Sequence, residues 1–355
     1  MDRYLVLENG AVFKGQAFGA DKEVVAEVVF TTGMVAYLET LTDPSYYGQA
    51  IVQTFPLIGN YGITPEDAES DMNGASAYIV REWCEKPSNF RSQGEIDSYL
   101  KQAGIPGLCG IDTRALTRII REKGVMNGAI TADPAKVDME ALRAYRVTGA
   151  VDACSTKEII EHKAENERFR VVLMDFGMKA NIARMLLKRG CSVTVVPART
   201  TAAEILAMKP DGIMLSNGPG DPAENTFCVE QIRKMMGRAP IFGICLGHQL
   251  TALAAGGRTV KLKYGHRGAN QPVKDLRTGR TYITSQNHGY AAVAESVPAA
   301  WESFRNANDG TCEGLEYPGL KCFTVQFHPE ARSGPRDTEF LFDRFIAMME
   351  EDGHA

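Results

Sequence analysis

From position 170 onward, short apolar runs alternate with amphipathic helical patterns, and this alternation is what most limits the possible folds. The predicted strands cover 170–174, 191–196, 212–215 and 240–244, and the predicted helices cover 179–189, 201–208, 223–236 and 246–255. Repeated units of this kind build an open, mostly parallel sheet with helices on both faces. Further strands are expected at 282–285 and 322–327, with a closing helix at 337–349.

The first part of the chain has a different pattern. Strand-like stretches at 4–7 and 23–31 are separated by turns rich in Gly and Asn. A helix is predicted over 113–123, with Asp112 as its N-cap and Gly124 at its end. The sequence therefore predicts an α/β protein in which an N-terminal α/β domain rich in strands (1–150), a polar linker (151–168) and a doubly wound domain (169–355) follow one another.

Composition narrows the possible partners. The chain has 355 residues, more than one hydrophobic core usually serves, and a formal net charge of -5. No block of Lys and Arg stands out, so neither nucleic acid nor a membrane surface is an expected partner. Because there is no signal peptide, no apolar run of membrane-spanning length and no C-x-x-C pair among eight cysteines, we expect a cytoplasmic chain with reduced thiols and no metal site.

Three segments follow predicted strands: 216–222, 245–249 and the stretch around His328. In an open α/β sheet, ligands bind beyond the carboxyl ends of the strands. The functional residues are therefore sought in these three segments.

The stretch 240–249, PIFGICLGHQ, is the most informative one. It places Cys245 between Gly243 and Gly247 where a strand passes into a helix, which is the thiol counterpart of the G-x-S-x-G nucleophile elbow. A helix N-terminus stabilises a thiolate, and the N–H of Leu246 is available to an oxyanion. The alternative, a small buried hydrophobic residue, is accepted for the other seven cysteines.

A nucleophilic cysteine needs a base, and His328 is the best placed of the six histidines because it follows the strand 322–327. Glu330 lies two residues further, with Pro329 between them, and a carboxylate there can fix the histidine tautomer. His248, one helical turn beyond Cys245, is interpreted as structural support. The alternative for His-Pro-Glu taken alone is an ordinary surface turn.

The loop SNGPGDPA (216–223) fits the outline G-x-G-x-x-A of a dinucleotide fingerprint. Pro219 and Pro222 remove N–H donors that a pyrophosphate would use, so this interpretation is rejected. Instead, Gly218 or Gly220 would bring an N–H close to the carbonyl attacked by Cys245. The phosphate-binding motif G-x-x-x-x-G-K-[ST] is absent from the sequence, so ATP chemistry would belong to another polypeptide.

Taken together, GICLGHQ (243–249), SNGPGDP (216–222) and FHPE (327–330) resemble the class I, or triad, glutamine amidotransferases over 170–355. Four further motifs resemble the small-subunit family of carbamoyl-phosphate synthase. They are TLTDPSYYGQ (40–49), GNYG (59–62), CGIDTRALTRIIREKG (109–124) and SQNHGY (285–290).

This resemblance implies specific roles. Cys245 would attack the side-chain amide of glutamine and form a γ-glutamyl thioester, with His328 as base and then acid and Glu330 orienting it. Leu246 and Gly218 would form the oxyanion hole. The implied glutamine-binding residues are Ser45, Gly218, Gly220, Leu246, Gln249, Asn287, Gly289 and Tyr290. Ser45 would come from the first domain and place the pocket where the domains meet, and Tyr290, where relatives often carry Phe, would act through its backbone.

The family also implies a partner. The chain would form a heterodimer, or a higher oligomer, with a large subunit that binds ATP and Mg and makes carbamoyl phosphate for arginine and pyrimidine synthesis. No cofactor is expected on this chain. The alternatives are a glutaminase subunit of another synthetase, a free-standing γ-glutamyl hydrolase and a non-catalytic interaction subunit. The first two leave the N-terminal motifs unexplained, and the intact Cys-His-Glu set argues against the third.

Overall fold

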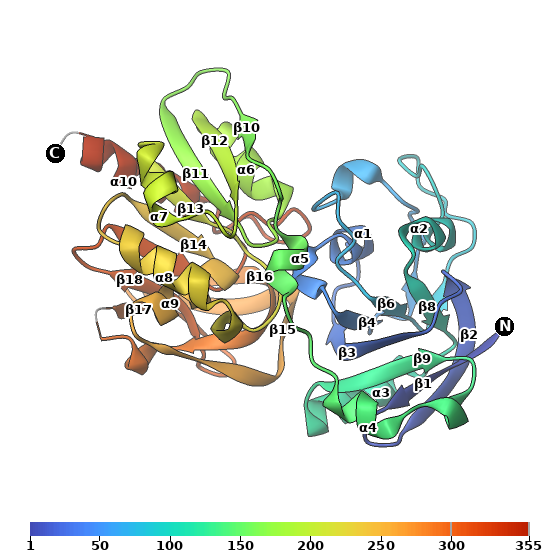
Figure 1. Ribbon diagram of the computed structural model, residues 1–355. Coiled ribbons are helices and arrows are strands. Elements are labelled where there is room, and N and C mark those ends of the chain that lie inside the picture. The colour runs from blue at the N-terminus through green and yellow to red at the C-terminus, as the bar shows by residue number, and fades with distance from the viewer. Residues whose placement is uncertain (299, 354–355) are drawn as a thin grey trace. The chain divides into compact units, whose positions relative to one another are not determined.

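The computed structural model describes residues 1–298 and 300–353 and divides into two compact units, Met1–Thr148 and Gly149–Ala355 (Figure 1). The stretch 151–168, predicted as a linker, is part of the second unit. It contains most of α5 (Ala150–Cys154) and all of β10 (Ile160–His162), which pairs antiparallel with β12 (Cys191–Pro197). The edge strand β10 was not predicted from the sequence because this stretch is polar. A strand at the edge of a sheet can be polar because it buries little of its surface.

The first unit is built on a closed barrel with the strand order β1-β2-β8-β6-β4-β3-β9. The strands are β1 (Asp2–Leu7), β2 (Val12–Gly19), β3 (Val24–Thr31), β4 (Gln49–Gln53), β6 (Ala77–Ile79), β8 (Pro106–Cys109) and β9 (Met126–Thr131). The turn joining β1 to β2 shows the predicted chemistry: Gly10 has φ 88°, and the side chain of Asn9 accepts a 3.0 Å hydrogen bond from the N–H of Ala11.

Helices and short elements cover this barrel. They are α1 (Tyr37–Leu41), α2 (Ile96–Ala103), α3 (Thr113–Lys123), α4 (Met139–Ala144), the pair β5 (Leu57–Ile58) and β7 (Glu82–Trp83), and the 3-10 turns η1 (Pro44–Tyr46), η2 (Pro65–Asp67) and η3 (Pro134–Lys136). The predicted bounds of α3 are confirmed. Its first turn is capped by Asp112, which accepts a 2.9 Å hydrogen bond from the N–H of Ala115, and Gly124 ends it with φ 99°.

The second unit contains one mixed sheet in the order β10-β12-β11-β13-β14-β19-β18-β17-β15-β16. Its parallel part consists of β12, β11 (Phe169–Asp175), β13 (Gly212–Leu215), β14 (Ile241–Ile244) and β19 (Cys322–Val325). The sequence predicted this part, and the doubly wound α/β fold is confirmed. The central strands β13 and β14 are apolar and buried throughout because they are covered on both faces.

The two faces carry separate hydrophobic cores. Along β11, Val172 and Met174 face one core, and Val171 and Leu173 face the other, as the two-residue period of a strand requires. The first core is completed by α7 (Ala202–Ala207), α8 (Thr226–Met235) and α9 (Leu246–Ala254), and the second by α6 (Ala180–Leu187) and α10 (Phe340–Gly353) (Figure 1). Predicted helix 223–236 begins later than expected, because the 3-10 turn η4 (Pro222–Glu224) precedes α8.

The antiparallel part of the sheet was largely missed. It consists of β15 (Arg258–Asp275), β16 (Thr281–Val293), β17 (Trp301–Asn306) and β18 (Cys312–Tyr317), with the 3-10 turn η5 (Ala294–Ser296) after β16. Only 282–285 of β16 had been predicted. β15 contains Gly and Pro, many of its side chains are exposed, and its pairing with β16 shifts register twice. Strands are predicted from a sequence by an apolar run or by strict alternation of apolar and polar residues, and β15 has neither.

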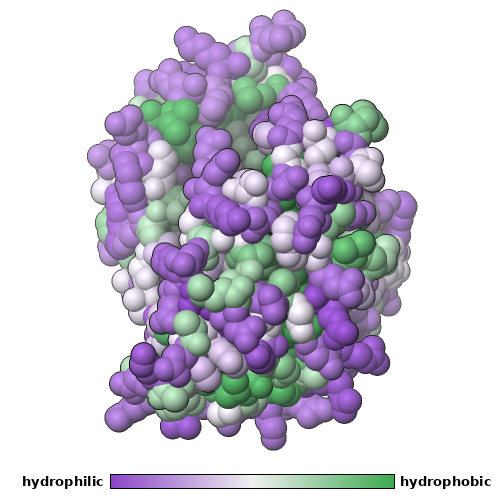
Figure 2. Space-filling view, turned by 90° about the vertical axis from the view of Figure 1, so that its right-hand side faces the viewer, coloured by the Kyte–Doolittle hydropathy of each residue, from purple (hydrophilic) through white to green (hydrophobic). Residues whose placement is uncertain are grey.

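The surface drawn in Figure 2 is mostly hydrophilic, with hydrophobic residues in small separate groups. Exposed apolar residues such as Phe90 and Met34 are ordinary on proteins of this composition. Among the described residues, no helix combines the length and apolarity needed to cross a membrane, and all eight cysteines are unbridged thiols.

Candidate active site

The turn between β14 and α9 holds Cys245 in an unusual conformation. Its φ of 52° and ψ of -101° lie in a region that side-chain-bearing residues rarely adopt. The turn is fixed by a 2.8 Å hydrogen bond from the N–H of Cys245 to the carbonyl of Val325 on the neighbouring strand β19. Strain of this kind collects at functional sites, where the surrounding structure can hold it.

Gly243 and Gly247 allow this turn to pack. A Cβ at Gly247 would lie 2.5 Å from the carbonyl oxygen of Leu215, and one at Gly243 would lie 3.0 Å from the backbone of Gly247. Side chains at these two positions would therefore clash where strand and helix meet. Cys245 itself is 2% exposed, and Leu246 is the first residue of α9, so the N–H of Leu246 has no acceptor within the helix.

His328 approaches from the adjacent strand. β14 and β19 run parallel with Ile244 opposite Val325, so Cys245 and His328 both follow the carboxyl ends of neighbouring strands. The Nδ1 atom of His328 lies 2.7 Å from Oε1 of Glu330, and because a carboxylate only accepts, Nδ1 carries the proton. The other ring nitrogen, Nε2, is buried and has no hydrogen-bond partner among the described residues. Nε2 therefore has a lone pair that can accept a proton.

Glu330 is buried yet remains a carboxylate. Burial raises its pKa, but attraction to His328 and to Lys179, whose Nζ lies 4.0 Å from Oε1, outweighs burial and holds the pKa below its ordinary value. The backbone carbonyl of Glu330 also accepts a hydrogen bond from the side chain of Asn181. Lys179 and Asn181 were not predicted as site residues, although they follow β11 at the same sheet edge, where ligands of an open α/β sheet bind.

The loop after β13 packs against the segment that follows β11. Ser216 accepts from the N–H of Phe176 at 2.9 Å, and Asn217 accepts from the N–H of Lys179 at 3.0 Å. A Cβ at Gly218 would lie 2.4 Å from the carbonyl oxygen of Phe176, and Gly220 has φ 86°. Both glycines are therefore required by the backbone.

β16 forms the wall beside the cysteine. The Sγ atom of Cys245 lies 3.7 Å from the carbonyl oxygen of Asn287. On α9, the side-chain amide of Gln249 donates to the carbonyl of Tyr290 at 2.7 Å and to the side chain of Gln326 at 2.9 Å. Cys245, Gln249 and the 287–290 segment, which includes Gly289, are thus assembled in one place, and the Gln249 amide group is held by the protein itself.

His248 and Ser45, which the sequence also singled out, lie in surroundings unlike those of Cys245 and His328. His248 is buried, and its Nδ1 lies 2.8 Å from Oγ1 of Thr324. Burial lowers its pKa to about 3, so it is neutral, which agrees with a structural role. Ser45 lies in η1 of the first unit, where its N–H donates to Asp43 at 2.9 Å. Its contribution to a glutamine pocket stays a prediction.

Two family models and several curated proteins match this chain. Residues 172–348 match the family model described as "Glutamine amidotransferase class-I", and residues 5–130 match "Carbamoyl-phosphate synthase small chain, CPSase domain". Proteins named carbamoyl phosphate synthase small chain are similar along nearly the whole sequence. The one from Clostridium perfringens is 51% identical over 98% of this chain and 99% of its own length, and the one from Bacillus caldolyticus is 50% identical over 99% and 97%.

A third relative, from Bacillus cereus, is 51% identical over 99% of this chain and 96% of its own length. Both family models and all three relatives agree with the predicted resemblance, and the relatives cover both structural units. The chain therefore belongs to the carbamoyl phosphate synthase small chain family, with a class I glutamine amidotransferase domain.

Proposed function

We propose that this chain is the glutamine-hydrolysing subunit of a carbamoyl-phosphate synthase and that Cys245, His328 and Glu330 carry out the hydrolysis. The observation that carries the proposal is the buried His328–Glu330 pair at the end of the strand beside the strained turn of Cys245. Family membership supports the amide substrate.

The first half of the reaction forms a thioester. The thiol of Cys245 loses its proton to Nε2 of His328, and the sulfur attacks the side-chain carbonyl carbon of glutamine. The imidazolium that results is stabilised by the carboxylate of Glu330, as the third member of a triad does. The N–H groups of Leu246 and Gly218 stabilise the oxyanion, and the positive end of α9 adds to this effect.

The second half releases the products. His328 returns its proton to the leaving nitrogen, so that the C–N bond breaks and ammonia departs. Water, deprotonated by His328, then attacks the γ-glutamyl thioester and gives glutamate and the free thiol. The substrate's amino-acid end is held by glutamine-binding residues of the second unit, Gly220, Gln249, Asn287, Gly289 and Tyr290. The role of Ser45 rests on the resemblance alone.

The ammonia is used by a second polypeptide. The name of the relatives, small chain, supports a large partner subunit, and the absence of a phosphate-binding motif from the sequence supports placing ATP and Mg on that partner. We propose a cytoplasmic heterodimer, or an assembly of heterodimers, that makes carbamoyl phosphate for arginine and pyrimidine synthesis.

The test uses the complex reconstituted with its large subunit. Cys245→Ser should reduce glutamine-dependent carbamoyl phosphate synthesis by at least about 10³-fold, because a hydroxyl at this turn is a poor nucleophile. Ammonia-dependent synthesis should be unchanged. Cys228→Ser, at a buried thiol of α8, is the matched control and should keep both activities. Wild-type use of glutamine by Cys245→Ser would disprove the assignment of the nucleophile.

A second measurement distinguishes the proposed subunit from a free-standing γ-glutamyl hydrolase. If hydrolysis is coupled to a partner, the isolated chain is a weak glutaminase and the large subunit activates it. Full glutaminase activity of the chain alone, unchanged by the large subunit, would identify a free-standing γ-glutamyl hydrolase instead.

A further inference from the structure

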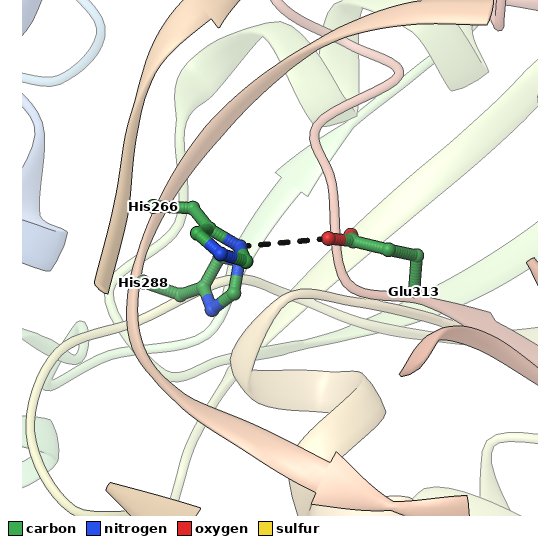
Figure 3. Close-up of side chains that lie close together, drawn as sticks. All are labelled: His266, His288 and Glu313. Atoms are coloured by element: carbon green, nitrogen blue, oxygen red, sulfur yellow. Dashed lines mark ion pairs between the residues drawn. The ribbon is translucent and has the colours of Figure 1, made fainter. Parts of the chain in front are cut away.

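A buried cluster that includes His288 of the 287–290 segment is not used by the proposed mechanism. His266 on β15, His288 on β16 and Glu313 on β18 point toward one another (Figure 3). Their rings and carboxylate come from separate strands, and all three residues are buried. Charged groups in such surroundings are costly unless they are paired, so the cluster needs an explanation.

His266 and Glu313 lie at ion-pair distance, without a hydrogen bond at Nδ1 of His266. Nδ1 of His266 lies 3.6 Å from Oε1 of Glu313, and Nε2 lies 2.8 Å from Oδ2 of Asp309. An imidazolium carries a proton on both ring nitrogens and so meets both carboxylates. Burial lowers the pKa of His266, but Glu313 and Asp309 outweigh burial and raise it. Burial raises the pKa of the Glu313 carboxyl, and the contacts with His266 and Asn306 offset only part of that rise. Glu313 is further fixed by a 2.9 Å hydrogen bond from the side chain of Asn306.

The pair is connected to the wall of the candidate site. His266 is the cross-strand partner of His288, and their rings meet edge to face with centroids 4.9 Å apart. His288 donates from Nδ1 to the carbonyl of Tyr290 at 2.8 Å, the same oxygen that accepts from Gln249 on α9. Burial, followed by the charge of His266, lowers the pKa of His288 and keeps it neutral, so that one N–H is directed at this carbonyl.

A second connection runs through the backbone. The carbonyl of Glu313 accepts a 2.9 Å hydrogen bond from the N–H of Gln326, two residues before His328. The side chain of Gln326 accepts from Gln249 at 2.9 Å. Glu313 therefore touches both the strand that leads to the candidate base and, through His266, the strand that faces Cys245.

From these contacts we infer that Glu313 and His266 are positioning residues, which hold the 287–290 segment against Cys245 and thereby set the affinity for glutamine. This inference rests on the proposed function, because it assigns the 287–290 segment to the glutamine pocket. Neither residue acts on the substrate directly.

The same three side chains could also hold a cation, since one ligand atom from each lies within 4.8 Å of the others. Two His and one Glu are a known zinc-ligand set. The ion pair is favoured because an imidazolium at His266 faces Glu313 and Asp309 at once, and because Nε2 of His288 faces Oε1 of Gln286 at 3.2 Å. The two explanations predict different behaviour toward zinc.

The experiment compares Glu313→Ala, Glu313→Gln and Glu316→Ala in the reconstituted complex. For Glu313→Ala we expect the KM for glutamine to rise about tenfold, the effect of losing one well-placed contact, with kcat unchanged. Glu313→Gln keeps a hydrogen-bonding side chain and should recover most of the affinity. Glu316, on the same strand but paired with Arg344, is the matched control, and its KM should equal that of the wild type.

Ammonia-dependent synthesis and the melting temperature show whether the variants are folded. An unchanged KM in folded Glu313→Ala would overturn the inference, and so would equal losses of kcat with glutamine and with ammonia. Zinc added alone to the metal-free complex should bind no differently in wild type and Glu313→Ala. If zinc bound to the wild-type cluster and not to Glu313→Ala, the cluster would be a metal site and the ion-pair explanation would be wrong. If Cys245→Ser abolishes glutamine use while Glu313→Ala behaves as wild type, only this inference fails and the proposed function stands.

Discussion

The parallel and antiparallel parts of the second unit's sheet contribute to the candidate site in different ways. The parallel strands β13, β14 and β19 end in the loops that carry Gly218, Cys245 and His328. The antiparallel strands β15, β16 and β18 contribute a wall, with the carbonyl of Asn287 3.7 Å from the thiol and the buried pair of His266 and Glu313 behind it. In the proposed mechanism, the parallel part supplies the reactive groups, and the antiparallel part holds the glutamine-binding segment in position.

This difference has a physical origin. Parallel strands joined by helices bring their carboxyl ends to one edge, so one residue at each end is enough to assemble a reactive set. An antiparallel wall works through many backbone and buried side-chain contacts, none of which reacts. Substitutions of the reactive residues at the ends of the parallel strands should therefore change kcat, whereas substitutions of the buried pair in the antiparallel part should change KM.

The largest effect is expected from His328→Asn. Removing the base should lower kcat for glutamine by about 10³-fold, which corresponds to about 4 kcal/mol of activation free energy. Ammonia-dependent synthesis should not change, and His162→Asn on the edge strand β10 should behave as wild type. If His328→Asn raised only the KM, the division of roles between the two parts of the sheet would be wrong.

Gly247→Ala tests whether the turn itself is indispensable. The new Cβ would lie 2.5 Å from a backbone oxygen that has little room to move, so we expect a loss of roughly 3 kcal/mol of stability. Urea unfolding of the purified chain measures this. Gly353→Ala, where an added Cβ meets nothing within 4 Å, should leave the midpoint unchanged. Equal midpoints for the two variants would mean that the close packing of β13 and α9 is not needed.

Glu330→Gln tests the pair in the parallel part through pH. The folded-state pKa of Glu330 lies below its ordinary value of 4.5, so its charge stabilises the fold above that pH and ceases to do so as the pH falls through the folded pKa. We expect the variant to be less stable than wild type by about 3 kcal/mol at neutral pH, because a buried partner charge is lost. The difference should shrink below pH 4.5. A difference that stays constant with pH would show that Glu330 is not ionised in the fold.

The smallest effect is expected from Thr324→Val, which removes the partner of neutral His248. The buried imidazole loses a 2.8 Å hydrogen bond, at a cost of about 1 kcal/mol, while kcat and KM should stay the same. A thermal melt measures the stability, and initial rates at a series of glutamine concentrations measure kcat and KM. Thr259→Val on β15 serves as the comparison. A changed kcat in Thr324→Val would give His248 a role in the chemistry.

Much of the parallel part could be predicted. Apolar runs mark the strands within 170–244, flanking glycines mark the elbow at Cys245, and a two-residue spacing marks the pairing of His328 with Glu330. All three patterns are properties of short stretches, so they can be recognised in the sequence. The motifs of both halves also pointed to the family that the relatives confirm.

Other features could not be predicted because they depend on distant segments. β15 has an irregular register and exposed side chains, so nothing local marks it as a strand. The barrel of the first unit closes only when β1 pairs with β9, about 120 residues later, and no short window contains that pairing. The predicted linker 151–168 became part of the second unit for the same reason, because β10 is defined by its partner β12.

By itself, the sequence determined which residues can react: a cysteine on a glycine-flanked turn, a histidine followed by a glutamate, and a glycine-rich loop at a strand end. The tertiary structure decided what surrounds them. It gave Cys245 a positive φ, placed Lys179 beside Glu330 and set Glu313 against His266. Reactivity is a property of residue types in short motifs, whereas burial, strain and ion pairing arise only when strands far apart in the sequence come together.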